Sequence, residues 1–573
     1  MATSSRPLTS SAPSIPIDKI VQWGIFILTL LLVIFPSWPI FYQSVMDAPL
    51  YEQTRKFTLD NFSHVLSDIE FWGVLGTTVV YALFTTIISL ATGATLALLI
   101  IRTDMPARGY FSLLINIPFY VSPLILAFGW SVIFGPQGFF TIVIRNIGLP
   151  TWDLYTLGGL IAVSAMYYMP YTYLYCTASL SLSDSQLEDA ARIAGANPLS
   201  VLFNVTLPLM RPALTYSALL TLVSSIEILS IPLVLGTPSN LNVLATYLYK
   251  IGIVGVKTDY GSIAVVSIFI VLLVTALVAL QNILMSQEKR FVTVSGKATR
   301  PRQLRLGVWK WPIFTVTATA VFIIIVLPLF GILLQAITPF VSPFINPLTI
   351  LTTENFDIIF RTEPYRLSVI NSVMIAVIGG AVGVIFMAVV AVVAYRSSLS
   401  TRNALRYVAL YPRAFPGLIV GIGFLWAFLL VPGFGSIRNT LFALTLAFIM
   451  RHLPLGFSSI SPSVLRISEE LDRAARVAGA NWIGVIRHIL IPILRPALLS
   501  AYIILAITFL KEYSVALFLF APGSQVIGTT MIELWRQGSS GPIAALATIQ
   551  MVIIFVLIAI SRWVLGVKLN EVE

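Results

Sequence analysis

Cysteine, histidine and charged residues are all scarce in this chain of 573 residues. The single cysteine, Cys176, excludes an internal disulfide and a cysteine-based metal cluster. The three histidines are His64, His452 and His488; they are scattered, and no His-rich, Cys-rich or carboxylate-rich cluster predicts a metal site. Charged residues make up 10% of the chain, whereas soluble domains carry about 25%. Together with 57% hydrophobic residues, this scarcity of charge predicts an all-α polytopic membrane protein.

Patterns for nucleotide hydrolysis and other catalysis are missing as well. The chain has no G-x-x-x-x-G-K-[ST] loop, because Gly296-Lys297-Ala298 lacks both the upstream glycine and the hydroxyl residue. It also has no H-E-x-x-H, no G-x-S-x-G and no clustered acids at membrane depth. We therefore expect no catalytic residue in this chain.

What the chain does contain is one segment that occurs twice. Residues 187–214 and 471–498 align without a gap at an offset of 284, and 14 of their 28 positions are identical. Chance does not produce such a match, so the chain consists of two copies of one unit. Three further positions match at an offset of 294: Asn61 with Asn355, Arg102 with Arg396, and Pro118 with Pro412.

Apolar runs long enough to cross a membrane, about 20 residues each, predict six spans per copy. In the first half they lie near 21–43, 72–101, 110–134, 156–182, 212–235 and 260–286. In the second half they lie near 312–337, 368–395, 405–430, 439–463, 497–520 and 541–565. The total is about 12 transmembrane helices. An even number per copy puts both repeated segments on one side of the membrane, so the repeats are parallel rather than inverted.

The distribution of basic residues predicts the orientation. Segment 288–311 holds seven basic residues and one acid, and loop 396–413 holds four arginines and no acid. Segment 44–71 holds five acids and only two basic residues. Because basic residues mark cytoplasmic loops, both termini, the linker and both repeated segments are expected in the cytoplasm. The net charge of +11 therefore does not predict binding to nucleic acid.

These observations divide the chain into four parts. We expect a disordered cytoplasmic tail over 1–18, a first repeat over 19–287, a basic cytoplasmic linker over 288–311 and a second repeat over 312–573.

Each copy of the repeated segment predicts two short helices joined by a tight turn. A candidate N-cap, Asp184 or Ser468, precedes acidic residues that suit the start of a helix. Gly195 and Gly479 interrupt the helix, since glycine adopts positive φ. A proline ends the second short helix in each copy: Pro208 and Pro492. A duplicated loop need not keep half its residues, so the pattern favours a docking device over an ordinary connection.

At these positions the chain resembles the permease subunits of binding-protein-dependent ABC importers. Their EAA signature is an acidic residue, Ala-Ala, three residues and Gly, then nine residues before hydrophobic-x-hydrophobic-Pro. The first copy fits at Asp189, Ala190, Ala191, Gly195 and Pro208. The second copy fits at Ala474, Ala475, Gly479 and Pro492. It has Arg473 where the signature has an acid, with Asp472 one residue earlier, so a salt bridge is not expected at that position.

The resemblance implies a fold, a location and partners. The fold is the type I (MetI-like) permease fold, in the bacterial cytoplasmic (inner) membrane and surrounded by lipid. The partners are a homodimeric ATP-binding subunit on the cytoplasmic side, which holds the ATP, and a periplasmic or lipid-anchored solute-binding protein. No cofactor bound by this chain is implied.

The fused length, and segments 227–238, 511–523 and 533–535, are similar to the ferric-iron (Fe³⁺) permeases. Permeases for thiamine, polyamines and aminophosphonates share this layout and stay open as alternatives. A secondary transporter of two parallel six-helix halves is a more distant alternative.

Three ionisable residues, Glu227, Lys511 and Glu512, lie within predicted spans. Such residues are rare there and face a cavity or a partner. In one interpretation Glu227 and Glu512, 285 positions apart, are opposed acids that draw in or gate a cation. In the other, Lys511 and Glu512 find partners in the bundle and only fix packing.

Tyrosines crowd the fourth predicted span. Tyr168, Tyr171 and Tyr175 share one helical face, at i, i+3 and i+7. Aromatic packing against neighbouring helices is the simpler explanation. A passage lined by phenols, which bind ferric iron, is the alternative.

Overall fold

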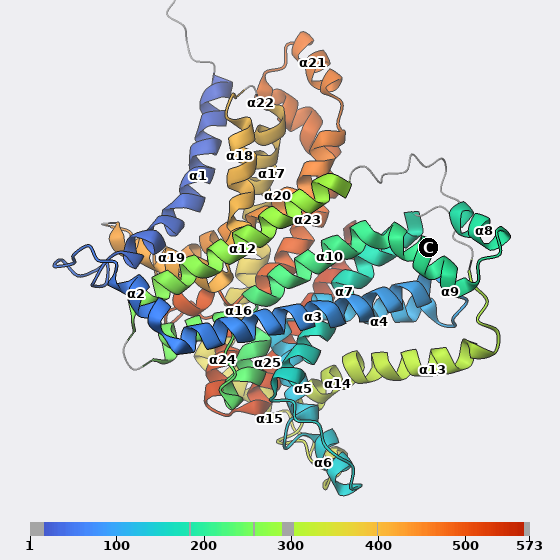
Figure 1. The fold of residues 1–573 in the computed structure, drawn as a ribbon. Coiled ribbons are helices and arrows are strands. Elements are labelled where there is room, and N and C mark those ends of the chain that lie inside the picture. Colours follow the sequence, from blue (N-terminus) through green and yellow to red (C-terminus); the bar gives the residue numbers. More distant parts are fainter. Residues whose placement is uncertain are drawn as a thin grey trace, which may run out of the picture.

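Helices make up almost all of the computed structural model (Figure 1). The structure describes residues 17–182, 185–255, 258–288, 303–397, 399–431 and 433–565, and no strand forms within these ranges. The all-α prediction is confirmed. The predicted tail up to residue 16 and most of the predicted linker lie outside the described residues.

The first repeat begins and ends with a long helix, and η marks its 3-10 or π-helical turns. Its elements are α1 (Ile17–Ser44), α2 (Asp60–Ser67), α3 (Ile69–Arg102), α4 (Arg108–Tyr120), α5 (Pro123–Phe134), α6 (Phe139–Asn146), α7 (Leu157–Leu182), α8 (Ser185–Ile193), α9 (Pro198–Val201), η1 (Leu202–Thr206), α10 (Leu207–Glu227), η2 (Pro232–Gly236), η3 (Thr237–Ser239), α11 (Leu244–Tyr249), η4 (Lys250–Val254) and α12 (Tyr260–Glu288).

The elements of the second repeat follow the same general order, but no counterpart of α6 or η4 lies among the described residues. They are η6 (Gly307–Trp309), α13 (Lys310–Val321), η7 (Phe322–Val326), α14 (Leu327–Ala336), η8 (Pro347–Thr349), α15 (Glu354–Arg361), α16 (Glu363–Met374), η9 (Ile375–Gly379), α17 (Gly380–Arg396), α18 (Arg402–Leu410), η10 (Tyr411–Ala414), α19 (Gly417–Leu430), α20 (Leu441–Arg466), α21 (Glu469–Val477), α22 (Trp482–Val485), η11 (Ile486–Leu490), α23 (Ile491–Lys511), η12 (Ala516–Phe518), α24 (Ile527–Arg536) and α25 (Ser540–Leu565).

Within the described ranges, ten helices are long and apolar enough to cross a membrane, or eleven if one bent pair counts as a span. Helix α7, predicted as the fourth span, is not among them although it has 26 residues and no charge. Its tyrosines and serines lower its hydropathy, and its counterpart α20 does pass.

Several predicted spans are broken or end early. The span over 110–134 splits into α4 and α5, and its counterpart over 405–430 bends by 108° between Ala414 and Gly417. The span over 212–235 stops at Glu227, and the span over 497–520 stops at Lys511. These breaks matter for function, because they place ionisable side chains at helix ends inside the bundle.

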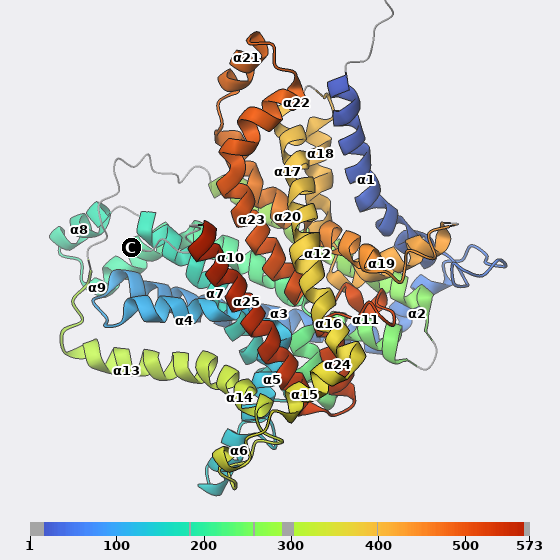
Figure 2. The ribbon, with the colours of Figure 1, turned by 180° about the vertical axis from the view of Figure 1, so that it is seen from behind.

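The first helix of each repeat packs against the other repeat. Helix α1 of the first repeat packs on α19 of the second, and α14 of the second packs on α5 of the first. Both crossings need a glycine. A Cβ on Gly423 would lie 2.1 Å from the Pro36 carbonyl oxygen, and one on Gly129 would lie 2.5 Å from that of Pro328. Figures 1 and 2 show α1 and α13–α14 as outer arms on opposite flanks.

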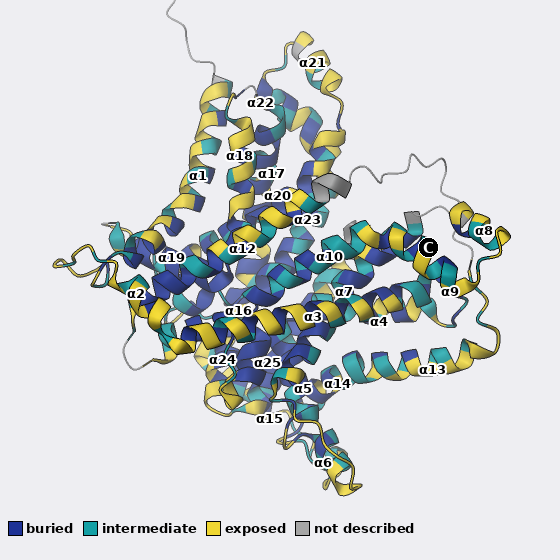
Figure 3. Ribbon diagram, in the orientation of Figure 1, coloured by how far each residue is buried: buried dark blue, intermediate teal, exposed yellow. Residues whose placement is uncertain are grey.

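The core lies where the repeats meet, and the outer helices face outward with apolar side chains. In Figure 3 the buried residues gather between α16, α25 and α19, while α1, α3 and α13 carry exposed residues. On α1 these exposed residues are themselves apolar: Ile20, Trp23, Ile27, Leu28, Leu31 and Ile34. An exposed apolar face of this length is typical of contact with lipid.

The elements sort onto two sides of the molecule. In Figure 1, α21 and the start of α1 lie at the top and α8 and the start of α13 at the right, whereas α2 lies at the left and α6 and α15 at the bottom. A diagonal from the upper left to the lower right of the view separates the first group from the second. Both repeated segments therefore share a side with the beginnings of both repeats, as parallel repeats require.

The end of the linker docks on the end of α3. Leu304 forms an isolated parallel bridge with Thr103, and the Leu306 N–H donates to Asp104 Oδ1 at 2.9 Å. This bond lowers the pKa of Asp104 below its usual value. The contact fixes where the second repeat starts relative to the first.

Candidate functional site

The two EAA segments, predicted over residues 184–211 and 468–495, have the predicted first short helix and glycine turn, with Gly195 at φ +90° and Gly479 at φ +89°. The prediction that Pro208 and Pro492 end a second short helix is wrong, because Pro198–Glu227 and Trp482–Lys511 each form one continuous helix. A π-helical turn, η1 or η11, lies just before each proline, where the proline N–H is missing. Asn197 Oδ1 accepts a hydrogen bond from the Ser200 N–H at 2.7 Å and so caps α9. The second segment is capped in the same way by the residue at the equivalent position, Asn481. Of the two predicted caps before the first helix, Ser468 Oγ accepts from the Glu470 N–H, and Asp184 lies outside the described residues.

Both EAA segments expose apolar side chains at matching positions. Three pairs of large apolar residues stand 284 apart and are 44–91% exposed: Leu187 with Leu471, Ile193 with Val477, and Leu199 with Ile483. The signature residues Ala190, Ala474, Pro208 and Pro492 are also exposed, and Ala191 and Ala475 are half-buried. Both EAA segments therefore present large apolar side chains at the same three positions of the surface.

A buried ion pair ties each EAA segment to the end of a long helix. Arg102, the last residue of α3, lies 3.2 Å from Glu188 of α8, and both side chains are 4% exposed. Arg396, the last residue of α17, lies 3.2 Å from Asp472 of α21. Removing one partner from a buried pair costs about 3–5 kcal/mol, because the other charge is left uncompensated.

The acid of the EAA signature is not the buried one. Asp189 pairs with Arg192 on its own helix at 2.8 Å, and Arg473 pairs with Glu469 in an exposed contact at 3.7 Å. In both copies the buried pair is made by the residue one position before the signature position, Glu188 or Asp472. The second copy thus keeps its ion pair through Asp472, although it lacks the signature acid.

A cavity of about 570 Å³ lies between the two repeats. The ends of α10 and α23 line it, together with α7, α20 and the break between α4 and α5. At that break Lys511 Nζ donates to the Phe119 carbonyl oxygen at 2.7 Å, so a cation of one repeat satisfies a carbonyl at the end of a broken helix of the other. Discontinuous helices beside a central site are typical of transporters.

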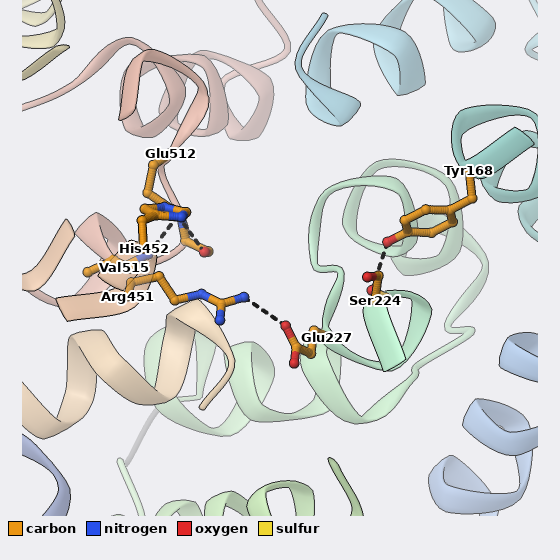
Figure 4. Close-up of polar contacts among 8 residues, drawn as sticks. Tyr168, Ser224, Glu227, Arg451, His452, Glu512 and Val515 are labelled. Carbon is orange, nitrogen blue, oxygen red and sulfur yellow. Dashed lines mark hydrogen bonds and ion pairs between the residues drawn. The ribbon is translucent and has the colours of Figure 1, made fainter. Parts of the chain in front are cut away.

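The acids of the cavity are held by basic side chains of the second repeat (Figure 4). Arg451 of α20 donates to Glu227, the last residue of α10, at 2.7 Å. His452 Nε2 lies 3.0 Å from Glu512, which also accepts from the Ser514 hydroxyl at 2.6 Å. The Glu227–Arg451 pair joins the two repeats, and both of its side chains are less than 20% exposed.

Five of the six predicted path residues line this cavity: Glu227, Lys511, Glu512, Tyr168 and Tyr171. The Tyr168 hydroxyl donates to the Ser224 carbonyl oxygen at 2.7 Å (Figure 4). Tyr175 does not line the cavity, and its ring packs 4.6 Å from that of Tyr216. Leu174 of the same turn still lines the cavity, so Tyr175 differs because its ring lies against Tyr216.

Two ionisable residues of the cavity were not singled out in the sequence analysis. Arg451 and His452 lie in a predicted span, and the ionisable-residue signal that identified Glu227 applies to them equally. The offset of 284 pairs Arg451 with Tyr167 and His452 with Tyr168. The same offset pairs Glu227 with Lys511, so Glu227 and Glu512 are neighbours of equivalent positions rather than equivalents.

The described part of the chain holds no group of three or more His, Cys, Asp or Glu side chains able to bind a metal ion.

Two curated proteins and one solved structure are among those similar to this chain. The ferric transport system permease protein FbpB of Actinobacillus pleuropneumoniae is 23% identical over 557 residues, which span 95% of this chain and 77% of that protein. A putative ferric transport system permease protein, FbpB 1 of Haemophilus influenzae, is 23% identical over 89% of this chain and 79% of its own. A crystal structure of a bacterial alginate ABC transporter with an alginate pentasaccharide-bound periplasmic protein is 18% identical, with a TM-score of 0.40 over 49% of this chain and 98% of that one.

The family model described as binding-protein-dependent transport system inner membrane component matches twice, over residues 89–289 and 383–565. Each match contains one EAA segment and one half of the cavity lining. The chain belongs to this family and carries its domain in two copies.

Proposed function

We propose that this chain is the permease of an ABC importer that moves ferric iron into the cytoplasm. A periplasmic or lipid-anchored binding protein would deliver the iron, and a homodimeric ATPase on the cytoplasmic side would drive the cycle. The observation that carries the cargo is the near end-to-end similarity to ferric transport permeases, over 95% of this chain.

The central cavity is the proposed translocation path. It lies on the boundary between the repeats, and both repeats contribute charged residues to it. Ionisable groups at membrane depth usually serve a pathway. Carboxylate and phenol oxygens suit a hard trivalent cation, and the described residues form no tight metal site that would trap it.

The EAA segments are the proposed docking sites for the ATPase. Their matched exposed apolar residues offer two similar surfaces on one side of the molecule, as a homodimeric partner requires. ATP-driven closure of that partner would draw α8 and α21 together. The two halves would then rock, and the bonds across the cavity, Glu227–Arg451 and Lys511–Phe119, would have to break or exchange.

The proposed orientation puts the EAA segments, the linker and both termini in the cytoplasm. Reporter fusions test it: a reporter that is active only in the cytoplasm, placed after residue 295 or residue 573, should be active. The same reporter inserted after residue 346 should be silent. The opposite pattern would place the ATPase docking sites outside the cytoplasm and would contradict the proposal.

The cargo is tested by uptake in a strain that lacks this chain. Radioactive ferric iron should enter only when the chain is restored together with its ATPase, and thiamine or putrescine should not follow it. If the chain restores uptake of thiamine or putrescine but not of iron, that compound is the cargo and ferric iron is not. Uptake that needs no ATPase would favour a secondary transporter.

A further inference from the structure

Helix α3 makes buried polar contacts with two different elements, one at its last residue and one 24 residues earlier. At its last residue, Arg102 pairs with Glu188 of α8. Earlier on the same helix, the Thr78 hydroxyl accepts a hydrogen bond from the backbone N–H of Leu244, the first residue of α11, at 2.9 Å. With a rise of 1.5 Å per residue, these contacts stand about 36 Å apart along one helix. Figure 1 shows α3 crossing the molecule from α9 to α2.

The second repeat builds the same device from different residues. Arg396 ends the continuous helix 363–396 and pairs with Asp472. The Ser372 hydroxyl of that helix accepts the backbone N–H of Ile527, the first residue of α24, at 2.8 Å. Both helix positions lie 294 from their counterparts in α3. Geometry has been kept while side chains changed, from Thr to Ser and from Glu to Asp.

Water cannot take the place of either hydrogen bond, because the residues on both sides of it are buried. Thr78 and Ser372 are at most 2% exposed, and Leu244 and Ile527 are at most 1% exposed. A buried N–H at the start of a helix needs an acceptor, and these hydroxyls provide it. A shift of either long helix along its axis must therefore carry α11 or α24 with it, or break the bond.

We infer that α3 and helix 363–396 are two levers that carry the displacement of the EAA segments to α11 and α24 on the far side of the cavity. Arg102 and Arg396 are the positioning residues at one end of the levers, and Thr78 and Ser372 are those at the other. The inference rests on the proposed docking of an ATPase on α8 and α21. It adds a direct connection from that face to the opposite one, which bypasses the lining of the cavity.

The test is a double-mutant cycle in reconstituted vesicles that contain the permease and its ATPase, supplied with loaded binding protein. The readout is the number of ferric ions taken up per ATP hydrolysed. Thr78→Val, which removes the acceptor but keeps the shape, should lower this ratio about threefold or more. Glu188→Gln should do the same at the other end of the lever. Thr78→Ser, which supplies the hydroxyl of the second repeat, should restore the ratio.

Combinations separate a lever from two independent structural contacts. The double variant Thr78→Val with Glu188→Gln should fall no further than the worse single variant, because one lever is already broken. Thr78→Val with Asp472→Asn breaks both levers, so its losses should multiply. Asp357→Asn, which removes an exposed ion pair of α15, serves as the control and should change nothing.

Losses that multiply within one lever, or an unchanged ratio in Thr78→Val, would overturn the inference. If Glu188→Gln fails to insert, Thr78→Val and Ser372→Ala still test the far ends. If the unaltered complex shows no ATP-dependent uptake, the proposed function fails and not the levers alone.

Discussion

At the scale of single residues, Gly195 and Gly479 are required by backbone conformation alone. A Cβ at either position would meet nothing within 4 Å, yet both adopt a φ near +90°. Positive φ costs an ordinary L residue about 1–2 kcal/mol, and a tenfold change in an equilibrium needs about 1.4 kcal/mol. In Gly195→Val or Gly479→Val we expect ATP-driven uptake to fall about tenfold or more, with normal insertion.

The matched control is Gly195→Asn, because asparagine tolerates positive φ better than any other side chain. It should keep most of the uptake that Gly195→Val loses, measured in the same vesicles. Equal losses in the two variants would mean that this position responds to size rather than to backbone conformation.

Variants of Glu227 and Glu512 test whether these acids serve a translocation path or only the packing of the bundle. The double variant Glu227→Gln, Glu512→Gln keeps the shape of both side chains but leaves Arg451 and His452 without carboxylate partners. We expect ferric uptake to fall about tenfold or more at normal protein level, because the carboxylates that a cation would meet in the cavity are gone and tenfold needs only about 1.4 kcal/mol. Normal transport in this variant, at normal protein level, would leave packing as the only role of the two acids.

The tyrosines of α7 offer an internal comparison. Tyr168 lines the cavity and bonds to the end of α10, whereas Tyr175 packs on Tyr216 outside it. Tyr168→Phe breaks a bond to a carbonyl oxygen worth about 1 kcal/mol, and uptake should fall roughly fivefold. Tyr175→Phe should leave uptake within about twofold of the unaltered protein. A larger loss in Tyr175→Phe than in Tyr168→Phe would contradict the assignment of the cavity as the path.

At the scale of elements, an asparagine and a glycine fix the turn after the first helix of each repeat. Asn61 Nδ2 donates to the carbonyl oxygens of Ser44 and Met46, and a Cβ on Gly261 would lie 2.2 Å from Asn61 Oδ1. The second repeat places Gly541 against Asn355 with the same 2.2 Å separation. The close approach explains why the Asn61–Asn355 match at an offset of 294 survived.

Gly261→Ala should therefore destabilise the protein by about 1–3 kcal/mol through overpacking, seen as a lower melting temperature in detergent. Gly73→Ala, where a Cβ meets nothing within 4 Å, is the control and should change the melting temperature little. A second control, Gly261→Ala combined with Asn61→Ala, removes the clash and should recover part of the loss. No shift in Gly261→Ala would mean that α2 and α12 separate at little cost.

The elements also show what the sequence could and could not predict. The predicted spans overlap every long helix among the described residues, including α7 with its low hydropathy, and the repeat located both EAA segments with their glycine turns. Hydropathy did not locate the ends of α10 and α23, since apolar residues continue past Glu227 and Lys511. Those ends depend on contacts with the other repeat, such as Lys511 with Phe119, which residues 392 apart in the chain do not reveal.

At the scale of the whole molecule, the duplication preserved the framework and changed the chemistry of the cavity. Positions related by the offset of 284 carry Glu227 and Lys511, or Tyr168 and His452. A symmetric cavity would oppose two acids across its axis, and their repulsion would have to be relieved. The diverged cavity instead pairs an acid of one repeat with a base of the other, so its two walls attract each other at rest.

The reciprocal crossing of first helices predicts how the chain behaves when it is cut. Because α1 packs on α19 and α14 packs on α5, each half covers an apolar surface of the other without help from the linker. Residues 1–295 and 296–573, expressed together as separate chains, should assemble and restore ferric uptake to within about threefold of the fused chain. Either half alone would leave these apolar faces and the charged cavity wall uncovered, so it should accumulate poorly and transport nothing. Co-purification followed by uptake in vesicles measures both outcomes; two halves that insert normally but never associate would show that the linker, and not the crossed helices, holds the molecule together.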